Sequence, residues 1–181
     1  MRKLIWLIIL ILALAAAGLY YGGAEKIMVW YYTNKSGQDA AKVEEYLNKA
    51  EEYQQKIKEG IKQGTDNFDY YIEQARAYQY AGNVDKAIKV YKDYESKVTD
   101  EIFFLYHNNL AKLYESKKEY QQAINEYLLV VEKFNAQYPS VLADLTRNYL
   151  ELGDKQNANK YYFQFKAAGY SDGVIEQRLE E

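Results

Sequence analysis

The sequence predicts an all-α protein in which short helical hairpins follow one another behind an apolar N-terminal segment. The 181 residues include one Pro and ten Gly, which favours long helices over a loop-rich β architecture. An uncharged apolar run opens the chain, and a pattern of small and aromatic residues recurs three times farther along. We therefore expect an N-terminal transmembrane or signal-anchor helix, then an α-solenoid of about three helical hairpins, with flanking capping helices.

Residues 1–33 form the first predicted segment, an apolar helix with an aromatic interface. Arg2 and Lys3 precede an uncharged run from Leu4 to Ala24. As a signal peptide, this run would end in an A-x-A cleavage site at residues 15–17. As an anchor, residues 4–21 provide 18 uncharged positions, close to the minimum for crossing a bilayer. We favour the anchor, because cleavage would leave a chain that begins with an exposed apolar and aromatic stretch. The residues assigned to the membrane helix are Leu4, Trp6, Leu12, Gly18 and Gly22.

Orientation follows from the charges that flank this run. Arg2 and Lys3 would stay in the cytoplasm, so the rest of the chain would be exported. The spacing of Gly18 and Gly22 would let two such helices pack closely. Aromatic residues of the kind found at a bilayer interface follow the run: Tyr20, Tyr21, Trp30, Tyr31 and Tyr32. The expected location is the bacterial inner membrane, as a single-pass protein with a periplasmic soluble part; a secreted or cell-surface assembly is the alternative.

Residues 34–64 are expected to form a linker and one long amphipathic helix. Thr33 to Gly37 is a polar break, and Ser36 followed by Asp39 is typical of a helix N-cap. Lys62 and Gly64 are typical of the helix end. Between them, apolar residues recur at spacings of three and four: Val43, Tyr46, Leu47, Ala50, Tyr53, Ile57 and Ile61. Such a stripe requires a partner surface, which the following repeats can supply.

Residues 65–167 contain the internal repeats. The first copy is Ala75, Tyr78, Gly82, Ala87 and Tyr91. The second, shifted by 36, is Ala111, Tyr114, Lys118, Ala123 and Tyr127, and the third, shifted by 35, is Thr146, Tyr149, Gly153, Ala158 and Tyr162. The small residues let paired helices approach, and glycine closes the turn between them. Lys118 predicts a turn that is either differently shaped or mildly strained. Pro139 lies where a helix begins, and residues 168–181 are expected to form a capping helix and tail with a polar outer face.

These residues resemble the tetratricopeptide repeat (TPR) family over about Phe68 to Lys166, and the chain is similar to membrane-anchored periplasmic TPR proteins. The chain departs from the family's pattern at Lys118, which replaces a glycine, and at His107 and Leu142, which occupy the usual Trp position. The prolines between repeats are missing, and longer linkers extend the repeat beyond the family's period of about 34 residues. The resemblance implies an inner face that is lined by the first helix of each repeat and holds peptides or partner helices. Carried over by position, the partner-binding residues are Ile72, Arg76, Tyr80, Asn108, Lys112, Glu115, Arg147 and Leu150.

The composition excludes most catalytic chemistry. The chain has no Cys and a single His, so thiol nucleophiles, cysteine-ligated zinc and multi-histidine metal sites are excluded. His107 falls at a helix core position and is interpreted as a hydrogen-bonded structural residue. Because 23 basic residues stand against 26 acidic ones, a nucleic-acid partner is not expected. We predict no catalytic residue, no cofactor and no metal, and therefore no enzyme.

The 21 tyrosines divide into two groups. Those expected in the core are Tyr78, Tyr91, Tyr114, Tyr127, Tyr149 and Tyr162. Those less constrained by position are Tyr80, Tyr94, Tyr106, Tyr138, Tyr161 and Tyr170. Tyrosine is common in protein interfaces, so an excess on the surface would indicate a partner. The alternative is that the extra tyrosines fill the space between packed helices.

The function predicted from these features is a non-catalytic, membrane-anchored scaffold that binds protein partners on the exported side. Arg76, Lys112 and Arg147 share one register of the repeats and would suit an acidic segment or helix, unless they are simply solvated cations. The alternative is a self-assembling subunit of a filament or oligomer, packed through its apolar N-terminal helix. A cytosol-facing organelle import receptor is less favoured, because it would reverse the orientation expected from Arg2 and Lys3.

Overall fold

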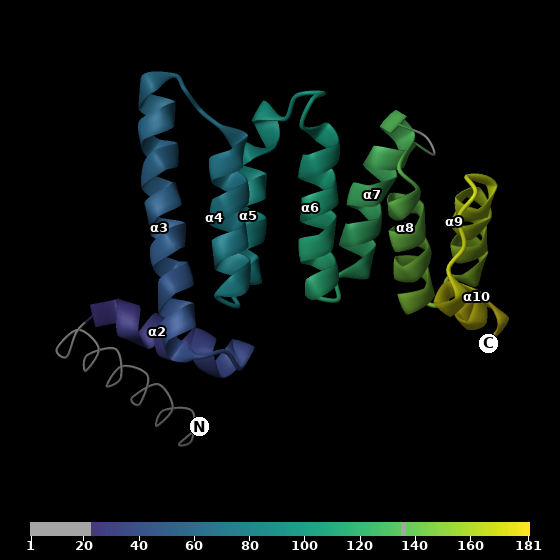
Figure 1. Ribbon diagram of the computed structural model, residues 1–181, viewed down its shortest axis with the longest axis horizontal. Coiled ribbons are helices and arrows are strands. Elements are labelled where there is room, and N and C mark those ends of the chain that lie inside the picture. Colours follow the sequence, from purple (N-terminus) through teal and green to yellow (C-terminus); the bar gives the residue numbers. More distant parts are fainter. Residues whose placement is uncertain (1–22, 135–136) are drawn as a thin grey trace, which may run out of the picture. The chain divides into compact units, whose positions relative to one another are not determined.

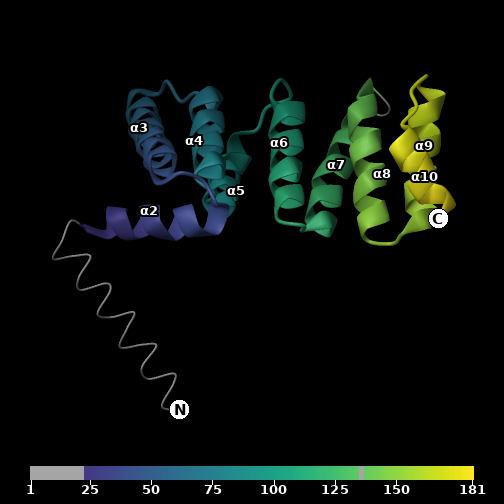
Figure 2. The same ribbon diagram turned by 60° about the horizontal axis from the view of Figure 1, so that its bottom comes forward.

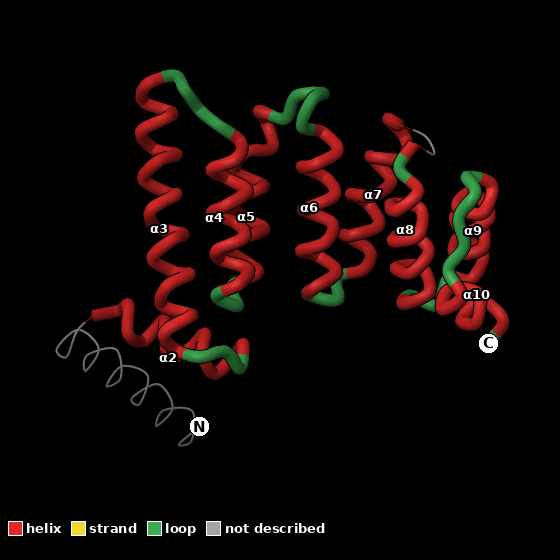
Figure 3. The backbone as a smooth tube through the Cα atoms, in the orientation of Figure 1, coloured by secondary structure: helices red, strands yellow, loops and turns green. Residues whose placement is uncertain are grey.

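The computed structural model describes residues 23–134 and 137–181, and within these ranges the regular elements are all helices (Figures 1 and 3). The chain divides into two compact units, residues 1–87 and 88–181. The predicted membrane helix, with Leu4, Trp6, Leu12, Gly18 and Gly22, lies outside the described residues. Within the described ranges, none of the helices has both the length and the hydrophobicity that crossing a bilayer requires.

The first unit contains α2 (Gly23–Ser36), α3 (Ala40–Gln63), α4 (Phe68–Tyr80) and the start of α5 (Val84–Tyr94). α3 and α4 form an antiparallel hairpin (Figure 1). The predicted stripe of α3 is buried at Val43, Leu47, Ala50 and Ile57. Gln74 Nε2 of α4 donates to the Ala50 carbonyl at 3.2 Å. Ile61 is 53% exposed, contrary to the prediction. α4 has 13 residues against 24 in α3, so it is too short to cover both ends of its partner.

The start of α3 differs from the prediction. Asp39 caps α3 by accepting from the Ala41 amide at 2.9 Å, whereas Ser36 is the last residue of α2. The Ser36 hydroxyl donates to the Tyr32 carbonyl at 2.6 Å. A serine can bond back to the carbonyl four residues earlier, and the polar stretch is helical to residue 36. The break is therefore shorter than predicted, and α2 runs across the boundary that we expected at residue 33.

The second unit begins within α5 and continues through the short 3-10 helix Glu95–Lys97, α6 (Phe103–Ser116), α7 (Tyr120–Phe134), α8 (Pro139–Glu151), α9 (Lys155–Ala167) and α10 (Gly173–Glu180). α6 pairs with α7, α8 pairs with α9, and α7 packs on α8. The predicted small residues Ala111, Ala123, Thr146 and Ala158 are all 0% exposed. The Thr146 hydroxyl donates to the Leu142 carbonyl at 2.8 Å. Small residues thus mark the close helix crossings, as predicted.

The turns after α4, α6 and α8 share one hydrogen-bond pattern. After α6, the Lys118 amide donates to the Glu115 carbonyl at 2.8 Å, and the Glu119 amide donates to the Tyr114 carbonyl at 3.0 Å. The residue at the turn has a positive φ in each case, 80° at Gly82, 61° at Lys118 and 73° at Gly153. This is the Schellman motif. Lys118 therefore keeps the shape of the glycine turns and bears the strain of a left-handed backbone.

α10 caps the chain's last hairpin, as expected. Asp172 is its N-cap residue, and Ile175 is 1% exposed against α8 and α9. Its outer face is less polar than we predicted, because Val174 is 70% exposed. Pro139 starts α8, as the sequence indicates.

Candidate protein-binding surface

In the first unit, the three predicted binding residues on α4 have different surroundings. Ile72 is 8% exposed and belongs to the core, so it presents little surface to a partner. Arg76 is exposed and forms an ion pair with Glu73 one turn earlier. Tyr80 is 47% exposed, and its ring lies 5.2 Å from the Tyr46 ring of α3. Of the three, Tyr80 offers the largest accessible apolar surface.

In the second unit, α6 presents an exposed strip formed by Leu105, Asn108 and Lys112. Their spacing of three and four places them on one side of the helix. Leu105 is 39% exposed, Asn108 is half-buried and Lys112 is exposed. Within residues 23–134 and 137–181, Lys112 forms no ion pair. The strip therefore combines an apolar contact with a cation that forms no ion pair within the described residues.

One turn beyond Lys112, Glu115 connects α6 to α8. Asn148, which is 2% exposed, donates from Nδ2 to Glu115 Oε1 and also to the Asp144 carbonyl at 2.7 Å. Burial raises the pKa of Glu115, the hydrogen bond from Asn148 opposes this shift, and the charge of Asp144 adds to it. Glu115 is thus held by a buried amide and is not simply a residue of the accessible strip.

Asp144 and Tyr127 lie beside this contact. Burial raises the pKa of Asp144, against the opposing charges of Arg147 and Lys112. Tyr127 of α7 is 0% exposed; burial and the nearby carboxylates of Asp144 and Glu115 raise the pKa of its hydroxyl. Lys112 therefore lies near the partly buried carboxyl groups of Asp144 and Glu115.

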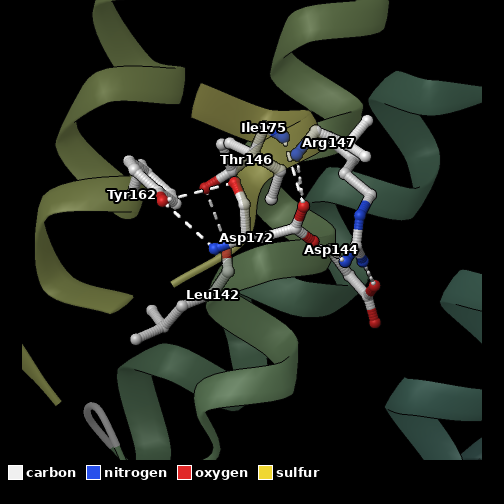
Figure 4. Close-up of polar contacts among 8 residues, drawn as sticks. Leu142, Asp144, Thr146, Arg147, Tyr162, Asp172 and Ile175 are labelled. Atoms are coloured by element: carbon white, nitrogen blue, oxygen red, sulfur yellow. Dashed lines mark hydrogen bonds and ion pairs between the residues drawn. The ribbon is translucent and has the colours of Figure 1, made fainter. Parts of the chain in front are cut away.

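Arg147 connects α8 to the start of α10 (Figure 4). Its guanidinium donates to Asp144 Oδ1 at 2.6 Å and to Asp172 Oδ2 at 2.9 Å. The other oxygen of Asp172 accepts from the amides of Val174 and Ile175, at 3.0 and 3.2 Å. The hydrogen bond from Arg147 lowers the pKa of Asp172. Arg147 thus fixes the capping helix, and two carboxylates compensate its charge.

The predicted register of three cations therefore has unequal members. Arg76 and Arg147 are each paired with carboxylates, whereas Lys112 is not paired within the described residues. Leu150, the other predicted residue of α8, is half-buried. That the three cations form one continuous binding surface across the repeats stays a prediction.

His107 has the structural role that we predicted. Its Nδ1 lies 2.7 Å from Glu126 Oε2 of α7, and its ring centre lies 4.2 Å from that of Phe103. Within the described parts of the chain, no three His, Asp or Glu side chains are close enough to hold a metal ion.

The less constrained tyrosines are more deeply buried than we expected. Tyr94, Tyr106 and Tyr161 are at most 8% exposed, whereas Tyr80 and Tyr170 are about half exposed. Tyr149, which was expected in the core, is half-buried. Most of the tyrosine excess in this group therefore contributes to helix packing, and only Tyr80 and Tyr170 offer large accessible rings.

Sequence reasoning missed the carboxylates that surround the predicted cations. Asp144 lies three residues before Arg147, and Glu73 lies three residues before Arg76. This spacing places two side chains on the same helix face, so local ion pairs could have been predicted. Asp172 is 25 residues from Arg147, and no sequence spacing indicates that contact.

Comparison with known proteins gives the fold. No family model and no curated protein sequence matches the chain. Solved structures do match: the nearly identical TPR-like repeats of a Podosopora anserina protein designated a kinesin light chain have 21% identity and a TM-score of 0.54, over 86% of this chain and 81% of that one. A singly substituted form of these repeats also has 21% identity, with a TM-score of 0.53 over 80% of this chain and 72% of that one. The chain therefore has the TPR-like repeat fold.

Proposed function

We propose that this protein is a non-catalytic scaffold that binds a protein partner through the exposed strip of α6. The observation that carries the proposal is the TPR-like fold, which arranges helices as binding surfaces, together with the accessible Leu105, Asn108 and Lys112 on one face. Leu105 supplies apolar contact, and Asn108 supplies a hydrogen-bonding group. Lys112 supplies a positive charge that no described neighbour pairs.

The partner segment is expected to place an acidic side chain opposite Lys112 and an apolar one opposite Leu105. A carboxylate from the partner would form a charge-assisted hydrogen bond with the Lys112 ammonium. Arg147 is already occupied by Asp144 and Asp172, so its contribution is to hold α10 in place.

The proposal includes an anchor formed by residues 4–21 in a bacterial inner membrane, with the repeats on the exported side. Its support is the uncharged apolar run and the position of Arg2 and Lys3 before it. Such an anchor would tether the repeats to the membrane, where they could meet a partner that is held there too.

The test is purification of the full chain from native membranes in mild detergent, followed by mass spectrometry of whatever accompanies it. We expect a foreign protein in stoichiometric amount with the wild-type chain, and about a tenfold weaker affinity for it with Lys112→Glu. The matched control is Lys155→Glu, an equal charge reversal at an exposed lysine of α9. Unchanged affinity of the Lys112→Glu variant would remove the α6 strip from the proposal.

Self-assembly is the second candidate, and one observation favours it. Phe163 of α9 is 75% exposed, and an aromatic side chain of this size would supply apolar contact area between copies of the chain. Purified assemblies that contain only copies of this chain, and that dissociate with Phe163→Ser, would favour this candidate over the scaffold. Assemblies that persist in this variant would contradict it.

A further inference from the structure

α2 is seated on the hairpin through one of its two faces. Asn83, in the turn between α4 and α5, is 4% exposed and donates from Nδ2 to the Tyr32 hydroxyl. A Cβ atom on Gly82 would lie only 2.8 Å from Ser36 Cβ. α2 also packs against α3. These contacts fix the rotation of α2 about its own axis, and therefore determine which side chains face outward.

The opposite face of α2 is aromatic, although it is exposed. Ile27, Trp30 and Tyr31 lie within about one turn of each other and are 36%, 64% and 50% exposed. A surface helix ordinarily places polar residues on its outer side. In α2 the neighbouring aromatic residues point in different directions. Tyr32 turns toward the hairpin and forms a hydrogen bond, while Trp30 and Tyr31 turn away from it.

The ionised side chains described near this face are positive, and Glu25 precedes them in the sequence. Of the side chains of α2 that the structure describes, residues 26–36, the ionised ones are Lys26 and Lys35. Lys35 Nζ lies 5.9 Å from the centre of the Tyr31 ring. Trp and Tyr rings flanked by lysines are typical of a membrane–water interface, where the rings lie among the headgroups and the lysines reach anionic lipids.

The chain immediately before this face is apolar. The uncharged run from Leu4 extends to Ala24, which is already the second residue of α2. We propose that α2 lies in the interface of a lipid bilayer, with Ile27, Trp30 and Tyr31 among the headgroups and Tyr32 held away from them. This inference rests on the proposed anchor at residues 4–21.

A lipid surface fits this face better than a second copy of the chain does. The three side chains expose on the order of 300 Å² in total, whereas a stable protein interface needs about 800 Å² per partner. An interfacial helix needs no such area when an adjoining anchor already holds it at the membrane.

The contacts between α2 and the hairpin would also determine how the first unit is oriented relative to the membrane. In Figures 1 and 2, α2 runs across the ends of α3 and α4, near the start of α3, and not alongside them. With α2 in the plane of the membrane, the α3–α4 hairpin stands away from the lipid. The end of α3 at Gln63 would then be about 30 Å or more from the headgroups, since a helix rises about 1.5 Å per residue.

The experiment uses the full chain in vesicles of phosphatidylcholine and phosphatidylglycerol at a ratio of about 3:1, chosen to present the anionic headgroups that attract lysines. The chain has two Trp residues, so Trp6→Phe leaves Trp30 as the only tryptophan, and excitation at the red edge of the absorption band selects it over the tyrosines. We expect a blue-shifted emission, and quenching at least about twofold stronger by lipids brominated near the headgroup than by lipids brominated deep in the acyl chains. The matched control adds Trp30→Phe and Ile61→Trp, which places the fluorophore at the far end of α3, where quenching should be negligible.

The outcomes separate the inference from the proposed function. If the chain fails to float with the vesicles, the anchor is wrong and the inference fails with it. If the chain floats but Trp30 is unquenched, or is quenched best by the deep label, the anchor stands and the interfacial position of α2 is wrong. Quenching of Ile61→Trp equal to that of Trp30 would overturn the orientation of the hairpin.

Discussion

Lys118 shows how a single residue can preserve a repeat's shape at an energetic cost. Its φ of 61° lies in the left-handed region, as do the φ values of the glycines at the corresponding positions of the other two turns. The Cβ of any other residue crowds the following carbonyl in this region, at a cost of about 1–2 kcal/mol. The turn's two hydrogen bonds, at 2.8 and 3.0 Å, hold the conformation despite this cost.

Replacing Lys118 with Gly should therefore stabilise the protein. We expect the free energy of unfolding to rise by about 0.5–1 kcal/mol, because the relief of strain exceeds the added entropy of the unfolded chain. Urea unfolding of the two proteins measures the difference. Lys117→Gly is the control; it has a right-handed φ of −91°, so glycine there should lower stability. A loss of stability in both variants would contradict the strain at Lys118.

Glu115 should make the stability of the second unit depend on pH. Its pKa is raised by burial in the folded state, so the folded protein binds the proton more tightly than the unfolded chain does. The free energy of unfolding is then highest below the ordinary pKa of a glutamate, and it falls as the pH rises through the folded-state pKa.

Glu115→Gln should remove this loss. Glutamine keeps an oxygen that can accept from Asn148 Nδ2 and carries no charge to desolvate, so we expect higher stability at pH 7 and a flatter stability profile between about pH 4 and pH 7. Thermal unfolding across this range is the measurement. Glu44→Gln, at an exposed position of α3, controls for the change in net charge. A profile as steep as that of the wild type would exclude Glu115 as its source.

At the scale of elements, α2 and the turn between α4 and α5 act together. Gly82 has two requirements, a φ of 80° and the close approach of Ser36. Gly153 in the corresponding turn after α8 has a φ of 73° and no atom within 4 Å of a Cβ placed on it. The two glycines thus differ only in the contact with α2, and they form a matched pair for measuring it.

Gly82→Ala should therefore cost more than Gly153→Ala. Both variants bear about 1–2 kcal/mol of left-handed strain, and Gly82→Ala adds roughly 1 kcal/mol from overpacking against Ser36. Amide hydrogen exchange should become faster in α2 for Gly82→Ala only. Ser36→Gly in the same chain should restore the slow exchange. Equal losses in both single variants, with α2 still protected, would show that the close contact does not hold α2.

At the scale of the whole molecule, the proposed anchor and the repeat fold are separable. The buried side chains of the described helices come from residues 43–175, far from the uncharged run at residues 4–21. α2 adds three exposed apolar side chains, too few to hold a protein on a bilayer without a second signal.

Deletion of residues 4–21 should thus abolish flotation with vesicles without affecting the repeats. We expect the midpoint of urea unfolding of the second unit and the far-UV helical signal per residue of the described helices to stay the same in matched detergent. Flotation assays and circular dichroism provide the two readouts. A truncated chain that still floats with the vesicles would place the membrane attachment in α2 and contradict the anchor.

Local periodicity in the sequence was enough to predict several features of the helices and turns. Small residues at Ala111, Ala123 and Ala158 predicted close crossings, Pro139 predicted a helix start, and Gly64 predicted a helix end; all are confirmed. These predictions succeed because helix period, capping and φ restriction act over a few residues. Ser36 is the local exception, because its hydroxyl satisfied a carbonyl of its own helix and did not cap the next one.

Which exposed groups are available to a partner depends on how the helices pack together. The repeat register makes Arg76, Lys112 and Arg147 equivalent, yet Asp172 of α10 pairs with Arg147, and no charge pairs with Lys112 within the described residues. Likewise, Tyr31 and Tyr32 are neighbours in the sequence, but the seat of α2 turns one outward and the other toward Asn83. Burial and charge compensation depend on residues far apart in the chain, and local sequence patterns carry no information about those distances.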